Sequence, residues 1–512
     1  MFHQQKSKRI PGLRRNLLKA DVRTSFAQQP APAVRFDQCD VARVTIDMLP
    51  DVALLVVFDN YVNNGLVYEW YMLVKVCRKW RNVIFGSPRR LHLRLYSMAW
   101  TPVRETLDAW PALPIVVWNN GHEKWGVDNI VAALEHNDRI YEIYLCEIRG
   151  SQFETVLAAL QQPFPALKSL VVSPRQRQEA GRWLRGDIVQ VQPDSFLGGY
   201  APRLQTLCLD RIPFPGLPKL LLSATHLVCL SLRSVPDSGY ISPEALATCL
   251  SVLTRLERLS ISPQYCPDRR RRRPPPQTRV LLPVLTDLWF YGVSEYLEDF
   301  VARLDTPLLR KLSASFFLQL IIDIPQLAQF IRRTPELKTH NEACVEFSHF
   351  NASVRFPQTS DGELSLAIPF KHSDWELSSL AQICNSLSFH QALIPAVERL
   401  YIQSILLSRW RDDMEGIQWL ELLSPFSSVK DLYISLEFTP RIAPALQELV
   451  EGTTEVLPAL QTLFLEATSL SELVQENIGK FVSARQLSGQ PITVSHWERK
   501  RSDLGLYKGL DS

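Results

Sequence analysis

The chain has 512 residues, of which 46% are hydrophobic and 21% charged, and its formal net charge is +3. Charge this evenly balanced gives no indication of a nucleic-acid partner, and none is expected. No apolar run approaches the ~20 residues that span a bilayer, and no signal-peptide core follows the start, so we expect a soluble intracellular protein of the cytoplasm or nucleus with no membrane association.

Residues 1–45 are expected to form a disordered basic N-terminal tail. Residues 1–26 hold many Lys and Arg and a single acid, Asp21. That composition is compatible with a mitochondrial transit peptide or a nuclear import signal. Pro11 and Gly12 interrupt any long amphipathic helix, so a basic tail is favoured. The segment QQPAPAV (28–34) indicates an extended linker.

Short helices are predicted in residues 46–90. The segment LPDVALLVVFDNYV (49–62) opens with Pro50, where a first helical turn tolerates proline. A second helix is predicted in residues 73–88, with an apolar stripe that Lys and Arg largely surround. The apolar residues at helical spacing are Leu54, Leu55, Phe58 and Val62 in the first helix, and Leu73, Val76, Cys77, Trp80 and Ile84 in the second. Helices this short cannot bury an apolar face alone, so they need a partner.

From about residue 90 onward one short motif recurs: an apolar residue, two variable residues, a leucine, one variable residue and a second apolar residue. Clear copies are PALKSLVVS (165–173), PRLQTLCLD (202–210) and PALQTLFLE (458–466). The central leucines of the copies are Leu170, Leu207, Leu230, Leu259, Leu288 and Leu312, followed later by Leu400, Leu432 and Leu463. Their spacings of 23 to 37 residues centre on the period that is typical of leucine-rich repeats.

The motif also predicts how the repeats stack. Alternate side chains of each strand point inward, and the helical stretch that follows returns the chain for the next parallel strand. No unit buries its leucines alone, but stacked units do. We therefore predict an α/β fold: after the helices of 46–90, residues 91–497 form a leucine-rich-repeat solenoid, a curved parallel sheet with helices on its outer face. The other predicted segments are an Arg/Pro-rich loop at 267–279, an irregular region at 335–394 and a C-terminal tail at 498–512.

The first helices resemble an F-box. Leu-Pro-Asp at 49–51 and Val-Cys-Arg-Lys-Trp at 76–80 stand where that family has its Leu-Pro start and its Val-Cys-Arg-x-Trp helix. Residues 46–497 as a whole resemble F-box/leucine-rich-repeat proteins, in particular the large families of mushroom-forming fungi. Phrases such as FGSPRRLHLRL (85–95) are similar to that group, whereas the link NNGLVYEWY (63–71) is longer than usual.

The resemblance implies a substrate-recognition subunit of a Skp–cullin–F-box ubiquitin ligase. Its F-box would bind a Skp-type adaptor, and through it a cullin, while the repeats would capture a protein substrate. The adaptor interface that the resemblance implies comprises Leu49, Pro50, Leu54, Leu55, Phe58, Val76, Cys77 and Trp80. Two alternatives stay open: Trp80 could pack against the first repeat as a cap, and the chain could be a leucine-rich-repeat scaffold that does not recruit the ligase.

Alternate residues of the predicted strands face the concave side of the solenoid. Large aromatic side chains in that register indicate an interaction surface, because exposed apolar area usually marks one. The candidate substrate-binding residues are Trp289, Tyr291, Tyr401, Tyr433 and Phe464. The alternative is that the segment 335–394 or a tail shields these rings.

The run RRRRRPPP (269–276) must loop out of the repeats. Adjacent like charges repel, and prolines donate no ladder hydrogen bonds. A solvated loop is favoured over two functional readings, which are a grip on an acidic or phosphorylated substrate and a nuclear import signal.

Motifs for catalysis and metal binding are missing from the sequence. It contains no His-Glu-x-x-His, no phosphate-binding Gly-x-x-x-x-Gly-Lys-Ser/Thr and no Gly-x-Ser-x-Gly. Its nine cysteines are scattered without a Cys-x-x-Cys pair, which argues against a disulfide framework and a cysteine zinc site. We expect no cofactor and no metal. The chain is predicted not to be an enzyme, and its partners would transfer ubiquitin.

Overall fold

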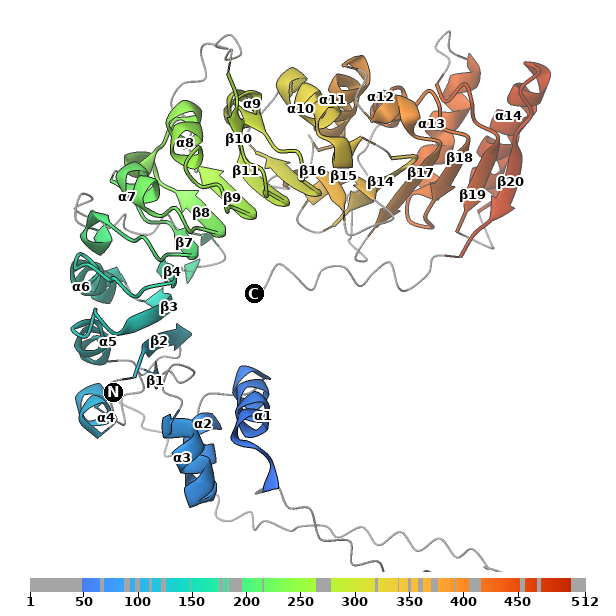
Figure 1. The fold of residues 1–512 in the computed structure, drawn as a ribbon. Helices are drawn as coiled ribbons and strands as arrows, with labels where there is room; N and C mark the ends of the chain where they lie inside the picture. Colours follow the sequence, from blue (N-terminus) through green and yellow to red (C-terminus); the bar gives the residue numbers. More distant parts are fainter. Residues whose placement is uncertain are drawn as a thin grey trace, which may run out of the picture.

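The computed structural model has the shape of an arc, in which strands line the concave side and most helices the convex side (Figure 1). The structure describes residues 48–64, 69–86, 93–96, 102–109, 113–120, 126–148, 150–174, 178–179, 182–183, 196–213, 216–263, 278–317, 321–338, 340–348, 351–357, 362–369, 376–390, 393–404, 416–451, 456–466 and 471–498. The predicted N-terminal tail, the arginine run 269–273 and the C-terminal tail beyond Glu498 lie outside these residues.

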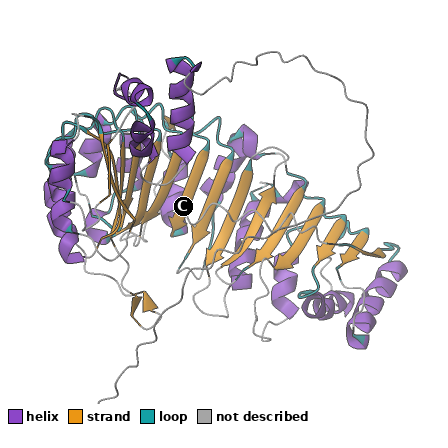
Figure 2. Cartoon of the chain, turned by 90° about the horizontal axis from the view of Figure 1, so that it is seen from below, coloured by secondary structure: helices purple, strands orange, loops and turns teal. Residues whose placement is uncertain are grey.

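A single sheet of sixteen strands runs through the arc (Figure 2). In spatial order its strands are β1 (Leu93–Tyr96), β2 (Ile115–Asn120), β3 (Ile140–Ile148), β4 (Ser169–Pro174), β7 (Thr206–Asp210), β8 (Cys229–Val235), β9 (Arg258–Pro263), β11 (Asp287–Gly292), β13 (Lys311–Phe316), β16 (Glu363–Pro369), β15 (Asn351–Pro357), β14 (Glu342–Phe347), β17 (Arg399–Ser404), β18 (Asp431–Ile434), β19 (Thr462–Leu465) and β20 (Thr493–His496). All of them run parallel to their neighbours except β15, so the predicted α/β class is confirmed.

Two small strand pairs lie outside this sheet. They are β5 (Gln178–Glu179) with β6 (Arg182–Trp183), and β10 (Val280–Leu281) with β12 (Leu304–Asp305). The α-helices are α1 (Asp51–Asn64), α2 (Glu69–Val76), α3 (Arg78–Gly86), α4 (Val103–Ala109), α5 (Val127–Leu134), α6 (Gly150–Ala159), α7 (Leu217–Ser223), α8 (Pro243–Leu250), α9 (Ser294–Ala302), α10 (Pro325–Arg333), α11 (Glu376–Phe389), α12 (Gly416–Leu423), α13 (Thr439–Glu451) and α14 (Glu472–Leu487). Short 3-10 turns occur at Phe196–Gly199, Asp237–Gly239, Pro335–Leu337 and Ile394–Ala396.

The recurring leucines form two unbroken rows of direct partners across the sheet. The first row joins Leu170, Leu207, Leu230, Leu259, Leu288 and Leu312, and the second joins Leu400, Leu432 and Leu463. All nine side chains are fully buried. Burying one leucine contributes about 1.5–3 kcal/mol, and a register shift of one residue would turn each leucine to the opposite face. The motif therefore fixes both the strands and their register.

The helices on the convex side close the core over these leucines. In α8, for example, the Ser242 side chain caps the first turn by accepting a hydrogen bond from the Ala245 backbone N–H at 3.2 Å, and Pro243 occupies the first turn. The same helix buries Leu246 and Leu250 against the sheet side. The buried apolar residues form one continuous core along the chain. None of the described helices has the length and apolarity needed to cross a membrane.

The described residues of the segment 335–394, which we expected to be irregular, form helices and strands that interrupt the strand order. The chain leaves β13, forms β14 three places further along the sheet, and returns through β15 to β16, which pairs with β13. Helix α11 then carries it forward to β17, beside β14. The strands β14 and β15 carry no Leu-x-Leu pair, which is why the motif did not predict them.

A buried histidine in this segment should make stability depend on pH. The His340 ring is buried, with Nδ1 at 3.2 Å from the Pro357 carbonyl oxygen and Nε2 without a hydrogen-bond partner. Burial lowers the pKa of His340 below its ordinary value, against the opposing effect of backbone hydrogen bonds. The unfolded chain therefore takes up this proton at a higher pH than the folded chain, and stability falls as the pH drops below about 6.5.

We expect the free energy of unfolding to fall by up to about 1.4 kcal/mol for each pH unit between the two pKa values of His340. Denaturant titrations at pH 8, 7, 6 and 5 measure this fall, and His340→Gln should make it shallower. The exposed His226 provides the matched control, since His226→Gln should leave the slope unchanged. Equal slopes in the parent chain and in His340→Gln would contradict the prediction.

Candidate functional site

The helices α1–α3 stand at one end of the arc (Figure 1). Helix α1 begins after Pro50, whose carbonyl accepts a hydrogen bond from the Leu54 N–H at 3.0 Å. The prediction of a single helix in residues 73–88 is wrong, because the chain forms two helices, α2 and α3, that are separated at Cys77. The Cys77 sulfur caps α3 by accepting from the Trp80 backbone N–H at 3.4 Å. The break changes the direction of the chain, so the predicted apolar stripe does not continue through it.

Two of the residues assigned to the adaptor interface lie inside this helical cluster. Leu54 and Phe58 are buried, and the Phe58 and Trp80 rings pack with their centroids 4.8 Å apart. The Lys79 ammonium donates to the Leu49 carbonyl at 3.0 Å and ties α3 to the start of α1. Enclosed side chains cannot reach a partner, so the assignment of Leu54 and Phe58 to the interface is corrected: they hold the helices together.

The exposed surface of α1 is apolar as well. At helical spacing Val52 and Val56 lie on the side opposite Leu54, whereas Val57 and Tyr61 lie beside the buried residues Leu54 and Phe58. We call the exposed residues Val52, Val56, Val57 and Tyr61 of this helix the N-terminal apolar face. Val52 is 68% exposed, Val56 51% and Tyr61 49%. A helix that is apolar all round is normally buried on all sides, and sequence periodicity alone did not show which side would remain open. Of the other predicted residues, Pro50 and Val76 are exposed, whereas Leu49, Leu55, Cys77 and Trp80 are half-buried.

The predicted substrate-binding residues lie on the concave face. Strand β11 buries Leu288 and Phe290 toward the helices and leaves Trp289 and Tyr291 exposed on the other side. Pairwise strand register places Trp289, Tyr401, Tyr433 and Phe464 in a single row across the sheet. Tyr291 lies two residues further along β11. The sequence therefore predicted the face correctly, because the strand alternation follows directly from the buried leucines.

The aromatic rings at the C-terminal end of this row pack against one another. Tyr433 stacks on Tyr401 and on Phe464, with both centroid distances 4.3 Å. Trp497 packs edge-on against both tyrosines and donates its indole N–H to the Ile434 carbonyl at 3.3 Å. Burial, with the Glu342 carboxylate nearby, raises the pKa of Tyr401 to about 12, so the phenol is neutral. Part of the shielding of these rings from solvent, the alternative considered above, comes from Trp497 and not from the segment 335–394.

Trp289 and Tyr291 are the more open aromatic pair. They are 38% and 41% exposed, and Tyr291 packs on Phe317 with ring centroids 4.9 Å apart. The residues directly opposite Trp289 on the neighbouring strands are Ser260 and Ser313. Because these two side chains are small, they cover little of the indole and leave it exposed to solvent. It is thus available to another molecule in a way that the stacked tyrosines are not.

A charged cluster that the sequence did not predict lies on the same face. Glu346, only 1% exposed, accepts hydrogen bonds from the Arg355 guanidinium and from the Gln403 amide, the latter at 2.8 Å. Arg355 also contacts Glu363 at 3.2 Å. Burial alone would lower the pKa of Arg355, but the Glu346 carboxylate outweighs it and holds that pKa above its ordinary value. Burial raises the pKa of the neighbouring Cys344 thiol, so this cysteine is no thiolate nucleophile.

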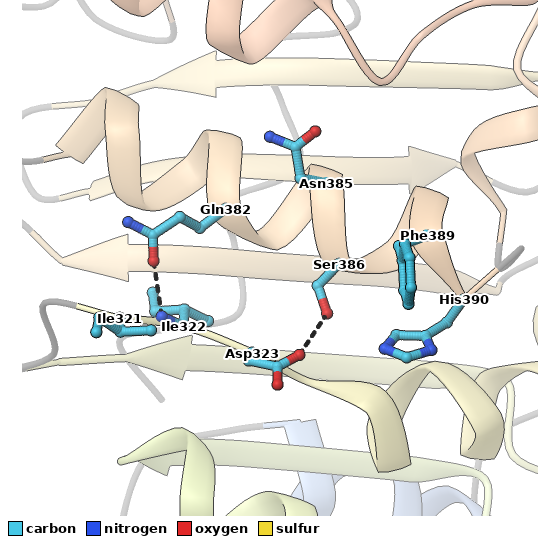
Figure 3. A pocket seen from close by; sticks show the side chains of 8 residues that line it. All are labelled: Ile321, Ile322, Asp323, Gln382, Asn385, Ser386, Phe389 and His390. Carbon is cyan, nitrogen blue, oxygen red and sulfur yellow. Dashed lines mark hydrogen bonds between the residues drawn. The ribbon is translucent and has the colours of Figure 1, made fainter.

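A hollow lies between α11 and the segment that precedes α10 (Figure 3). Its volume is about 400 Å³. Gln382 accepts from the Ile322 backbone N–H at 2.7 Å, and Ser386 accepts from the Ile324 N–H at 3.0 Å. Ser386 also donates to Asp323 at 3.4 Å. These polar groups tie the segment to the helix, so we assign no ligand to the hollow.

No group of three His, Cys, Asp or Glu side chains that could hold a metal ion occurs within the described part of the chain. A scan against models of known protein families and a search of curated proteins each gave no match to this sequence. The interpretation of function therefore depends on the two surfaces described above, the N-terminal apolar face and the concave face.

Proposed function

We propose that the chain is a substrate-recognition subunit of a Skp–cullin–F-box ubiquitin ligase. Helices α1–α3 would form an F-box that binds a Skp-type adaptor, and the strands and helices after them would form a leucine-rich-repeat solenoid that captures a protein substrate. The observation that carries this proposal is the N-terminal apolar face. Its valines and tyrosine remain exposed although Leu54 and Phe58 of the same helix are already packed, and exposed apolar area of this kind usually marks a protein interface.

The position of α1–α3 supports the same division of labour. They lie at one end of the arc, so a partner on their outer side leaves the concave face open to a second protein (Figure 1). The leucine rows support the solenoid, because each strand buries its leucines only against its neighbours. In this proposal the chain is not catalytic and needs no cofactor. It works in the cytoplasm or nucleus and brings substrate and ligase together.

The interface is revised from the sequence-based one. Val52, Val56, Val57 and Tyr61 make the contact, extended by Pro50 and Val76. Leu54, Phe58 and Trp80 support it from inside through the ring contact of Phe58 with Trp80. Tyrosine is one of the residue types that carry most of the binding energy at protein interfaces, which makes Tyr61, next to Val57, the expected hot spot.

Replacing Val52 and Val56 together with Glu should weaken binding of a Skp-type adaptor by roughly 30-fold or more, because two charges would be buried in an apolar contact. Both positions are exposed in the free chain, so the melting curve should not change. The affinity of the purified proteins is measured by titration calorimetry. Leu487→Glu on α14, at a position that is 89% exposed, is the matched control and should bind as the parent does.

Two outcomes would contradict the proposal in different ways. Full binding by the Val52→Glu/Val56→Glu variant would show that the adaptor uses another surface. Absence of binding by the unchanged chain would favour the alternative, a leucine-rich-repeat scaffold that does not recruit the ligase.

A further inference from the structure

The open part of the concave face has a definite charge pattern. We call the concave side of β8, β9, β11 and β13 around the indole the Trp289 patch. Two successive rows of cross-strand partners compose it: Cys229, Arg258, Asp287 and Lys311; then Ser231, Ser260, Trp289 and Ser313. The pair Tyr291 and Ser315 continues it, with Arg233 of β8 and Ser262 of β9 at the same end, where the register between β8 and β9 shifts. These four strands carry three cations and one acid, a net charge of +2.

Two of the three cations of the patch have no partner among the described residues, whereas Arg233 donates to the Ser231 hydroxyl at 3.2 Å. Arg258 and Lys311 are exposed, and neither side chain makes a hydrogen bond or an ion pair with the described residues. Asp287, which lies between them, accepts instead from the hydroxyl of Thr286 at 2.7 Å. Cross-strand charges further along the same face do pair, as Arg399 does with Glu342 at 2.6 Å. The Trp289 patch therefore offers unpaired positive charge beside an exposed aromatic ring.

We propose that the Trp289 patch binds an extended acidic segment of a protein, with an apolar side chain packed on the Trp289 ring and carboxylates at Arg258 and Lys311. The proposal rests on the proposed function only in treating the concave face as the surface that captures substrate. It names the chemistry of that substrate. Arginine and aromatic residues are the types that dominate binding energy at protein interfaces.

The spacing of the strands gives the spacing of the acidic groups. Arg258 and Lys311 stand on either side of β11, so they are about 10 Å apart at the usual strand separation. A chain in the extended polyproline II conformation rises about 3.1 Å per residue and brings side chains i and i+3 to the same side, so acidic residues at these two positions bridge that distance. The apolar side chain then lies between them, above Trp289.

The same geometry favours carboxylates over phosphates and peptide over nucleic acid. Phosphate groups in proteins are usually bound by several cationic groups that converge on one point, whereas Arg258 and Lys311 are held apart by β11. A nucleic-acid backbone presents closely spaced charges in a continuous line, and Asp287 would repel it in the middle of the row.

The test uses the full chain, immobilised, and three libraries of ten-residue peptides that are random except at two fixed positions three residues apart. The fixed residues are Glu, Gln or phosphoserine. Two exposed charge pairs amount to about tenfold in affinity, so the Glu library should be retained about tenfold better than the Gln library, and added salt should reduce the difference. Sequencing of the retained peptides should show apolar residues between the two glutamates.

Substitutions locate the effect. Arg258→Ser with Lys311→Ser should abolish the preference for Glu over Gln, and Trp289→Ala should abolish the preference for an apolar residue between the glutamates. Lys219→Ser with Arg332→Ser removes two exposed cations from the helices α7 and α10 and should change nothing. All positions lie on the surface, and a melting curve for each variant verifies folding.

Equal retention of the Glu and Gln libraries would overturn the proposal. Stronger retention of the phosphoserine library, or of a twelve-nucleotide oligothymidylate, would also overturn it, because the occupant would then be a phosphate or a nucleic acid. Adaptor binding is measured separately on the same preparation. Adaptor binding without Glu selection refutes this inference alone, and Glu selection without adaptor binding refutes the ubiquitin-ligase function alone.

Discussion

Replacing Arg355 with Ala is expected to lower the free energy of unfolding by about 3–5 kcal/mol. The guanidinium lies between Glu346 and Glu363, and Glu346 is almost completely buried. Removing the cation leaves that carboxylate without its partner in a place where water cannot replace it. Urea denaturation followed by circular dichroism measures the loss.

Two further variants separate the buried charge from the loss of packing. Arg355→Met combined with Glu346→Gln should recover most of the stability, because no charge is then left buried. Arg104→Ala removes the exposed ion pair with Glu135, whose side chains are 2.9 Å apart, and should cost at most about 1 kcal/mol. If Arg355→Ala cost no more than Arg104→Ala, the cluster would not be a buried ion pair in solution.

This cluster also shows where sequence reasoning reached its limit. The segment NASVRFP (351–357) alternates apolar and polar residues as strands do, but neither it nor EACVEF (342–347) contains a Leu-x-Leu pair, so they did not fit the motif. The alternation was the available signal for strands there. That Glu346 meets Arg355 depends on the antiparallel pairing of β14 with β15, and no repeat on either side has such a pairing.

The strands on either side of β14 and β15 were predictable because leucine recurs in them at the same register. A leucine such as Leu259 is flanked on both neighbouring strands by leucine, so burial of any one fixes its neighbours. The concave positions of Trp289 and Tyr433 followed by alternation alone. Stacking among Tyr401, Tyr433 and Phe464 did not follow, since it depends on adjacent strands carrying rings at the same height.

The prediction for the N-terminal helices was only partly correct: their place in the sequence was predicted, but the second one is two helices, α2 and α3. The periodic pattern predicted one helix through Cys77, whereas in the structure the Cys77 sulfur caps the start of a new helix, α3. In α1 the valines occupy both sides of the helix, so the periodic pattern could not distinguish the packed side from the open one. That distinction comes from tertiary contacts, here the Phe58–Trp80 pair, and it changes which residues an adaptor would touch.

The two surfaces differ in how they would bind. The N-terminal apolar face carries aliphatic side chains and no compensating charge among Val52, Val56, Val57 and Tyr61, which suits a stable, mostly apolar contact. The Trp289 patch combines the exposed Trp289 and Tyr291 rings with the exposed cations Arg258 and Lys311, which suits a weaker contact that depends on salt. In the proposed function a stable contact would suit an adaptor that stays bound, and a weaker contact would suit a substrate that is exchanged.

Replacing Trp419 with Ala is expected to cost about 3–5 kcal/mol of unfolding free energy. The indole is completely buried between Phe347 of β14 and Phe438, with ring centroids 5.9 and 5.7 Å away. It joins α12 to the strand where the antiparallel insertion meets the later repeats. The cavity should loosen this junction first, so amide hydrogen exchange should rise in β14, β17 and β18 before it rises in β7 to β9.

Trp419→Phe provides the control for this prediction. The indole N–H is buried without a hydrogen-bond partner, so a phenyl ring removes an unsatisfied donor while it keeps most of the apolar contact. Its cost should be less than half that of Trp419→Ala. Equal costs would mean that the ring volume is not what stabilises the junction. Uniform hydrogen exchange along the arc would mean that the repeats unfold as one cooperative unit, rather than from this junction outward.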